Sequence, residues 1–235
     1  MNIARDLNDE YGLLLRRGKL EPLQAHFQAR VEALSNDTSA AAQELFTKKW
    51  GLTQLPVFNI ILMLLTMNPS SRSSYAAITE YLINTAQVPV DGTDISGTTA
   101  MMHAISTKPY LDPAFAQILY EAGAQINHRN RYGCTAAHEF VLVTQADSES
   151  KRRATEALQW FLAHGGDIDI KDGDGMTPRH IIRCLASRMP ELGAAVKTAE
   201  GGKNEKSTSG GKKVGRNDPC SCGSKRKFKV CCGKN

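Results

Sequence analysis

The sequence predicts an all-α protein, a solenoid of helix–turn–helix repeats followed by a short basic tail rich in cysteine. Three observations predict it. One turn pattern recurs three times in the middle of the chain, apolar helical segments that end at glycine lie between these turns, and four of the six cysteines lie in the last sixteen residues. A helix pair that cannot bury its apolar face alone does so by stacking on its neighbours, which produces a solenoid.

Residues 1–47 are expected to form a helical cap on the solenoid. Apolar side chains recur at helical spacing over roughly Ile3–Arg17 and Leu20–Leu34. The acidic side chains of these segments and the absence of a lysine-rich polar face favour packing on the protein over binding to a membrane. Because acidic residues such as Asp6 and Asp9 stand where a secretion signal is apolar, we also expect a cytoplasmic protein.

The recurring turn pattern is Asp or Asn, then Gly three residues on, then Thr two further. The Asp or Asn side chain opens such a turn by bonding the backbone that follows, and Gly adopts the positive φ that the turn needs. Thr then caps a helix, and a second helix ends at a left-handed glycine. The turn glycines are 36 and 42 residues apart. The segments are Asp94–Ala104, Asn130–His138 and Asp172–His180, and the helix-ending glycines are Gly123 and Gly165.

The solenoid is expected to span residues 48–196, which include one weaker and one enlarged repeat. Trp50–Thr53, followed by the apolar segments Leu55–Met67 and Tyr75–Thr85, fits a degenerate first repeat. The polar run Gln145–Arg153 predicts an enlarged loop or longer helices in the third. None of the apolar stretches reaches the roughly 18 residues that cross a bilayer, so no membrane span is expected.

The pattern resembles that of the ankyrin-repeat family, Asp-x-x-Gly-x-Thr-Pro-Leu-His. The match is best at Asp172–His180 and next best at Asn130–His138, whereas Asp94–Ala104 lacks the Pro, Leu and His. The clear resemblance covers about residues 94–182. It implies a non-enzymatic protein that binds partners through its turn tips and the concave face of its inner helices. On that analogy the tip candidates are Ile95, Ser96, Arg131, Tyr132, Gly173 and Asp174.

Histidines and cysteines within the repeats are interpreted as structural. The resemblance implies that His138 and His180 tie their turns to Thr and to neighbouring backbone, and His103, one place off register, is expected to be exposed. Cys134 lies at a turn with no base predicted beside it. Cys184 lies in an apolar stretch and is expected to fill the core.

Residues 197–213 have no apolar periodicity and are rich in Gly, Ser, Thr and Lys, so they are expected to form a flexible linker. From Lys197 to the end, eleven Lys and Arg stand against three Asp and Glu, a formal charge of +8. The whole chain carries +5, so residues 1–196 carry 5 − 8 = −3. The tail is therefore expected to seek acidic surfaces of protein or nucleic acid.

Residues 214–235 are expected to form a zinc knuckle. Two cysteines one residue apart can ligate one ion from a tight turn, and an adjacent pair eight residues later can complete a tetrahedral site. In a reducing compartment this spacing favours metal over disulfides, and zinc is the usual ion in closed four-thiolate sites, although iron also fits them. The expected ligands are Cys220, Cys222, Cys231 and Cys232.

The run from Val214 to Gly233 resembles the SEC-C motif, the tail of the SecA translocation motor that is also appended to unrelated proteins. The resemblance implies zinc binding and docking to a chaperone or the ribosome. Two interpretations follow: a protein–protein adaptor, or an adaptor whose basic tail binds RNA. The tail's single aromatic, Phe228, argues against a stacking platform for bases. The tail residues expected to contact a partner are Lys225, Arg226 and Lys227.

Overall fold

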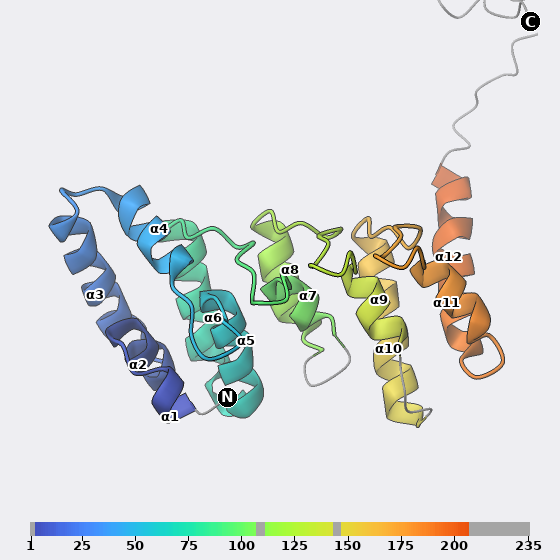
Figure 1. The fold of residues 1–235 in the computed structure, drawn as a ribbon, viewed down its shortest axis with the longest axis horizontal. Helices are drawn as coiled ribbons and strands as arrows, with labels where there is room; N and C mark the ends of the chain where they lie inside the picture. The colour runs from blue at the N-terminus through green and yellow to red at the C-terminus, as the bar shows by residue number, and fades with distance from the viewer. Residues whose placement is uncertain (1–2, 107–110, 143–146, 207–235) are drawn as a thin grey trace, which may run out of the picture. The chain divides into compact units, whose positions relative to one another are not determined.

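The computed structural model describes residues 3–106, 111–142 and 147–206, and every regular element in them is a helix (Figure 1). The prediction of an all-α fold is therefore confirmed. The chain divides into two units, residues 1–197 and 198–235. The helices are α1 (Ile3–Asp6), α2 (Glu10–Arg17), α3 (Leu20–Ala33), α4 (Thr38–Thr47), α5 (Val57–Met67), η1 (Pro69–Ser71), α6 (Arg72–Glu80), η2 (Tyr81–Thr85), α7 (Ala100–Ala104), α8 (Pro113–Glu121), α9 (Ala136–Val141), α10 (Ser148–Ala163), α11 (Pro178–Cys184) and α12 (Pro190–Lys206).

Helices α1 to α4 lie in the segment predicted to be an N-terminal cap, and the first predicted helix is broken in two. The break lies at Asp9, whose Oδ1 accepts a hydrogen bond from the Gly12 amide at 2.8 Å and so starts α2. The same carboxylate accepts from Trp50 Nε1 at 2.8 Å and pairs with Lys48 Nζ at 3.0 Å. Asp9, which fits the polar face of one continuous helix in the sequence, is therefore the N-cap of α2. Its carboxylate also binds α2 to the start of the first repeat.

The cap packs directly on the first helix pair. Helix α2 contacts α5, and α3 contacts α6. Nine consecutive residues of α5, from Val57 to Leu65, are buried, which explains why this helix is apolar on all sides. No helix of the described residues is both long and apolar enough to cross a membrane.

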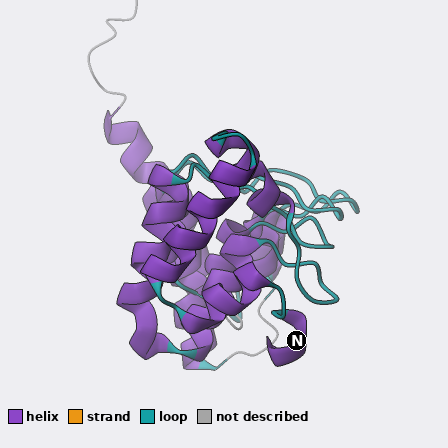
Figure 2. Ribbon diagram, turned by 90° about the vertical axis from the view of Figure 1, so that its left-hand side faces the viewer, coloured by secondary structure: helices purple, strands orange, loops and turns teal. Residues whose placement is uncertain are grey.

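Within residues 1–197 the helix pairs follow one another in chain order (Figure 1). Helix α5 contacts α6 and α7, α7 contacts α8, and α9 contacts α10 and α11. Figure 2 shows the connecting loops projecting to one side of the helices. Gly123 and Gly165 follow α8 and α10 with φ of 91° and 81°, so both helix ends have the left-handed conformation predicted for them.

Two segments differ from simple expectation. Helix α10 has 16 residues against nine in α8, so the polar run that begins at Gln145 is, where described, the first turns of a longer helix. Asp147 starts this helix by accepting from the Ser150 amide at 2.9 Å. Helix α12 continues to Lys206, so residues 197–206 of the predicted linker are helical, because the helix begun at Pro190 runs on through good helix formers such as Ala199 and Glu200.

Candidate functional site

The three predicted turns share one hydrogen-bond pattern. In each, the Oδ1 of the first residue accepts from the backbone amides two and four residues later, at 2.8 and 3.0 Å for Asp94, 3.0 and 3.0 Å for Asn130, and 3.0 and 2.9 Å for Asp172. The glycine three residues on has φ of 75° to 82°. An Asn serves as well as an Asp because only one side-chain oxygen is used. The local chemistry predicted from the sequence is confirmed.

A degenerate turn precedes these three. Trp50 and Leu55 exchange two backbone hydrogen bonds, of 3.0 and 2.9 Å, across a turn that begins at Gly51. Gln54 occupies the position of the turn glycine and has φ of 54°. Pro56 then stands at the N-cap of α5, where the other turns have Thr. Trp50–Thr53 therefore opens a first repeat, as predicted, without the Asp or Asn that defines the others.

The four turns are joined edge to edge. In each junction the amide of the second residue of one turn donates to the carbonyl of the third residue of the preceding turn. The donor–acceptor pairs are Ile95 to Thr53 at 2.9 Å, Arg131 to Ser96 at 2.9 Å, and Gly173 to Tyr132 at 2.8 Å. These backbone bonds fix the spacing of the turn tips. The successive turns are therefore an ordered row and not independent loops.

His138 acts as the predicted structural tie. Its ring is 1% exposed, and Nδ1 accepts from the Thr135 amide at 3.0 Å. Since Nδ1 accepts, the proton lies on Nε2, which donates to the Met176 carbonyl of the next turn at 3.2 Å. His138 therefore connects its own helix cap to the following repeat.

The other two histidines differ from expectation. His180 is exposed, and its backbone amide, not its ring, bonds Thr177, at 3.1 Å. In the described chain no further turn of the repeat pattern follows to accept from the ring. His103 was expected to be exposed but is half-buried, with Nε2 2.9 Å from Asp94 Oδ2. Burial alone would raise the pKa of Asp94, but the bonds from His103 and from the Thr98 and Ser96 amides hold that pKa below its usual value.

Side chains at the turn tips are mostly exposed. Arg131 and Asp174 are exposed, and 67% of Tyr132 is accessible to solvent. Two further exposed apolar residues of the turns escaped the sequence interpretation. Leu52 is 95% exposed on the first turn, and Met176 is 38% exposed on the last. The signal for Leu52 was its place directly after Gly51, the residue that opens the degenerate turn.

These tips carry most of the exposed large apolar side chains in the described residues. Four of the six lie on the turns, while Met67 and Leu142 lie at helix ends elsewhere. Exposed apolar side chains on neighbouring turns that backbone bonds hold together are typical of a protein-binding surface. We call this set the tip row, and its members are Leu52, Ile95, Tyr132 and Met176.

Neither cysteine of the repeats resembles a catalytic thiol. Cys134 is half-buried, and burial, followed by the nearby charge of Asp172, raises its pKa, which disfavours the reactive thiolate. Cys184 is exposed, with Sγ 3.5 Å from His180 Nε2, so the prediction that it fills the core is wrong. It is exposed because α11 has no further repeat packed on this side among the described residues.

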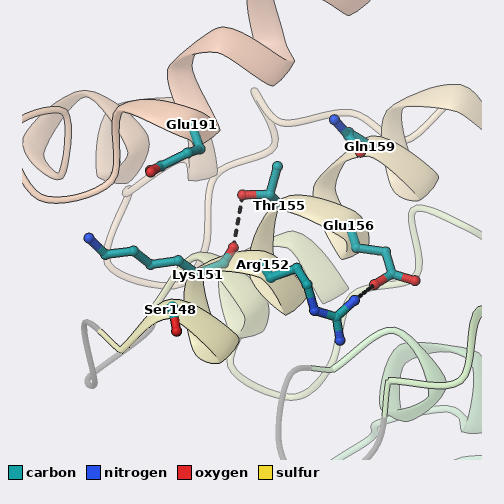
Figure 3. Close-up of a pocket in the computed structure, with 7 residues that line it drawn as sticks. All are labelled: Ser148, Lys151, Arg152, Thr155, Glu156, Gln159 and Glu191. Atoms are coloured by element: carbon teal, nitrogen blue, oxygen red, sulfur yellow. Dashed lines mark hydrogen bonds and ion pairs between the residues drawn. The ribbon is translucent and has the colours of Figure 1, made fainter.

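A shallow cavity of about 740 Å³ lies on unit 1, between α10 and the start of α12 (Figure 3). Its charged groups have both signs, and Arg152 pairs with Glu156 at 2.8 Å. Such a surface offers polar contacts but no nucleophile paired with a base. Its lining residues are Ser148, Lys151, Arg152, Thr155, Glu156, Gln159 and Glu191.

The predicted tail sites lie outside the described residues. This applies to the four zinc-ligand cysteines, Cys220, Cys222, Cys231 and Cys232, and to the basic residues Lys225, Arg226 and Lys227. Among the residues that are described, no three His, Cys, Asp or Glu side chains are grouped so that they could hold a metal ion.

Comparison with known proteins finds similar segments in SecA subunits and a similar fold in ankyrin repeat structures. A 40-residue segment is 60% identical to the SecA protein translocase subunit of Finegoldia magna, and it covers 16% of this chain and 4% of that protein. An 86-residue match to SecA of Cupriavidus metallidurans is 36% identical and covers 37% of this chain and 9% of the relative. The chain thus spans less than a tenth of the length of these relatives.

A solved ankyrin repeat domain from Acinetobacter baumannii is 18% identical, with 82% of this chain and 99% of that chain covered at a TM-score of 0.37. The assignment of repeats rests on the four turns and their helix pairs rather than on this match. The family model of the SEC-C motif matches residues 216–234. The SEC-C motif is associated with zinc in general. The chain therefore combines ankyrin-type repeats with a SEC-C motif.

Proposed function

We propose that this protein is a non-enzymatic adaptor whose repeats bind one protein and whose zinc-stabilised tail docks a second. The observation that carries the proposal is the tip row, which gathers four of the six exposed large apolar side chains on turns joined by backbone hydrogen bonds. A partner that covers the row gains apolar burial without paying to order the loops that present it.

Tyr132 is the expected centre of this surface. It is the only aromatic of the row, its neighbour Arg131 is also exposed, and Tyr and Arg are enriched among residues that dominate binding energy. Its carbonyl accepts from Gly173 at 2.8 Å, which anchors the backbone beneath the ring. Ile95 and Asp174 flank it on the adjacent turns.

The tail would contribute through metal. Four thiolates at Cys220, Cys222, Cys231 and Cys232 fit a closed tetrahedral zinc site, which is structural rather than catalytic. The SEC-C match supports this donor set, and Lys225, Arg226 and Lys227 would offset the charge of four thiolates around one divalent ion. A peptide this short folds only when the metal is bound, so zinc would set the shape that the second partner recognises.

Affinity capture in cytoplasmic extract tests the two halves separately. Tyr132→Asp should lose one set of partners and Cys231→Ser another, while both variants keep the thermal unfolding of the wild-type repeats. Met67→Asp is the matched control, because Met67 is 61% exposed but lies outside the tip row. Retention of every partner by Tyr132→Asp, or equal losses in Met67→Asp, would contradict the role of the row.

The charge of +8 on residues 197–235 favours one rival, in which the tail binds RNA. In that case a peptide of residues 197–235, loaded with zinc, should bind RNA with an affinity that falls steeply as salt rises. Binding that is absent at low salt would remove this rival.

A further inference from the structure

The last described turn of the repeat pattern, at Asp172, carries the same kinds of hydrogen-bonding groups that the turn at Asn130 uses to bind it. At Asp172 these groups bind no following turn among the described residues. The turn at Asn130 holds the turn at Asp172 through three contacts. The Tyr132 carbonyl accepts from the Gly173 amide at 2.8 Å, Arg129 Nη2 donates to the Lys171 carbonyl at 2.9 Å, and His138 Nε2 donates to the Met176 carbonyl at 3.2 Å.

Each of these three groups has a counterpart 42 residues later, the spacing of the two turn glycines. The carbonyl of Asp174 corresponds to that of Tyr132, the ammonium of Lys171 to the guanidinium of Arg129, and the ring of His180 to that of His138. All three residues are exposed. Apart from the 3.5 Å contact between His180 and Cys184, these groups have no hydrogen-bond partner in the described part of the chain.

The backbone also leaves room for an incoming chain. A Cβ at Gly133 would lie 2.9 Å from the amide nitrogen of Gly173, which shows how closely the following turn approaches. At the equivalent Gly175 no atom of the described residues lies within 4 Å of that position. Among the described residues, the edge that is closed at the third turn is therefore open at the fourth. There the Asp174 carbonyl is a free acceptor, and the exposed side chains of Lys171 and His180 carry the donors, although the His180 ring now lies against Cys184 Sγ.

We infer that the edge formed by Lys171, Asp174 and His180 is a docking site for a tight Asp-x-x-Gly-type turn presented by a partner protein. The occupant follows from continuity with the turns of this chain: the backbone bond is made three times between successive turns, and the two side-chain contacts join it between the turns at Asn130 and Asp172. The partner turn would donate one amide to Asp174 and offer one carbonyl to His180 and another to Lys171. This site would bind backbone amides and carbonyls of the partner, whereas the tip row offers apolar side chains, so the two are distinct sites.

The probe for this site is a head-to-tail cyclised peptide with the sequence of residues 168–179, which contains the turn that the preceding repeat holds. It is titrated into the isotopically labelled full-length chain and followed by NMR. We expect saturable shifts of the Asp174, Gly175 and His180 amides, with a dissociation constant of about 1 mM or weaker for so small a contact. Amides of the three inner turns, whose edges are already paired, should move little.

His180→Ala and Lys171→Ala should each weaken binding by about fivefold or more, since each removes one hydrogen bond. Lys19→Ala, which removes an exposed lysine of the cap, should bind as the wild type does. Absent shifts, shifts spread evenly over all four turns, or unchanged binding by His180→Ala would overturn the inference. So would self-association of the free chain that His180→Ala abolishes in sedimentation, because the occupant would then be a second copy.

Discussion

The two histidines that occupy the same repeat position should differ sharply in their effect on stability. His138→Ala removes a ring that is 1% exposed and that bonds Thr135 at 3.0 Å and Met176 at 3.2 Å. The buried Thr135 amide loses its partner, which costs about 1–3 kcal/mol, and the bond to Met176 contributes about 1 kcal/mol more. With the cavity left by the ring, we expect the free energy of unfolding to fall by about 4 kcal/mol.

His180→Ala is the matched control. Its ring is exposed and holds no backbone group, so its removal should change the free energy of unfolding by about 0.5 kcal/mol or less. Urea unfolding of the full chain at neutral pH, followed by far-UV circular dichroism, measures both values. A His138→Ala variant that stays within about 1 kcal/mol of His180→Ala would refute the account of how successive repeats are tied.

Three further predictions concern backbone, pH and metal. Gly133→Ala should lower the free energy of unfolding by about 2–3 kcal/mol, because its Cβ would lie 2.9 Å from a backbone nitrogen of the next turn. Gly165→Ala is the control: no described atom lies within 4 Å of its Cβ position, so it should cost only the roughly 1 kcal/mol of a positive φ. Equal losses in urea unfolding would be inconsistent with this. Because the pKa of Asp94 is lowered in the folded protein, its carboxylate stabilises the fold fully at pH values above its ordinary pKa of 3.8 and loses that contribution as the pH falls further. Asp94→Asn should therefore flatten the dependence of the free energy of unfolding on pH in this acidic range. Parallel pH profiles for the variant and the wild type would count against this. Chelation of zinc should leave the urea unfolding of the repeats unchanged, and a loss of repeat stability on chelation would argue against separate modules.

The turns could be predicted from sequence because their chemistry is local. The side chain of Asp94 or Asn130 bonds amides two and four residues away, and Gly97 supplies the positive φ between them, so every participant lies within five residues. The Thr caps are equally local. Fold class follows from the repetition of that local pattern.

Features that depend on a neighbouring element were missed. Leu52 belongs to a turn without the Asp or Asn signature, and its alignment with the next turn is fixed by the bond between the Ile95 amide and the Thr53 carbonyl. Likewise, the apolar stretch around Cys184 is typical of a core, yet this side of α11 is exposed because no further repeat packs on it in the described chain. Burial at the end of a stack cannot be read from one helix alone.

Break points within a helix are similarly hidden. Asp9 fits the polar face of one long helix, but its carboxylate caps α2 at the Gly12 amide and also holds Trp50, which lies 41 residues away. The partner Trp50 is far away in the sequence, so the sequence of this helix alone does not reveal the second role of Asp9. Partner choice at the tips depends still more on groups outside this chain, so from sequence only the position of the tips was predictable.

The adaptor account depends most on the claim that the tail is shaped by metal. Elemental analysis of the purified, reduced full-length chain by inductively coupled plasma mass spectrometry tests it directly, alongside a variant in which Cys231 and Cys232 are both replaced by Ser. The account predicts about one zinc ion per wild-type chain and almost none in the variant. A wild-type chain without stoichiometric metal, or a variant that retains it, would contradict the account.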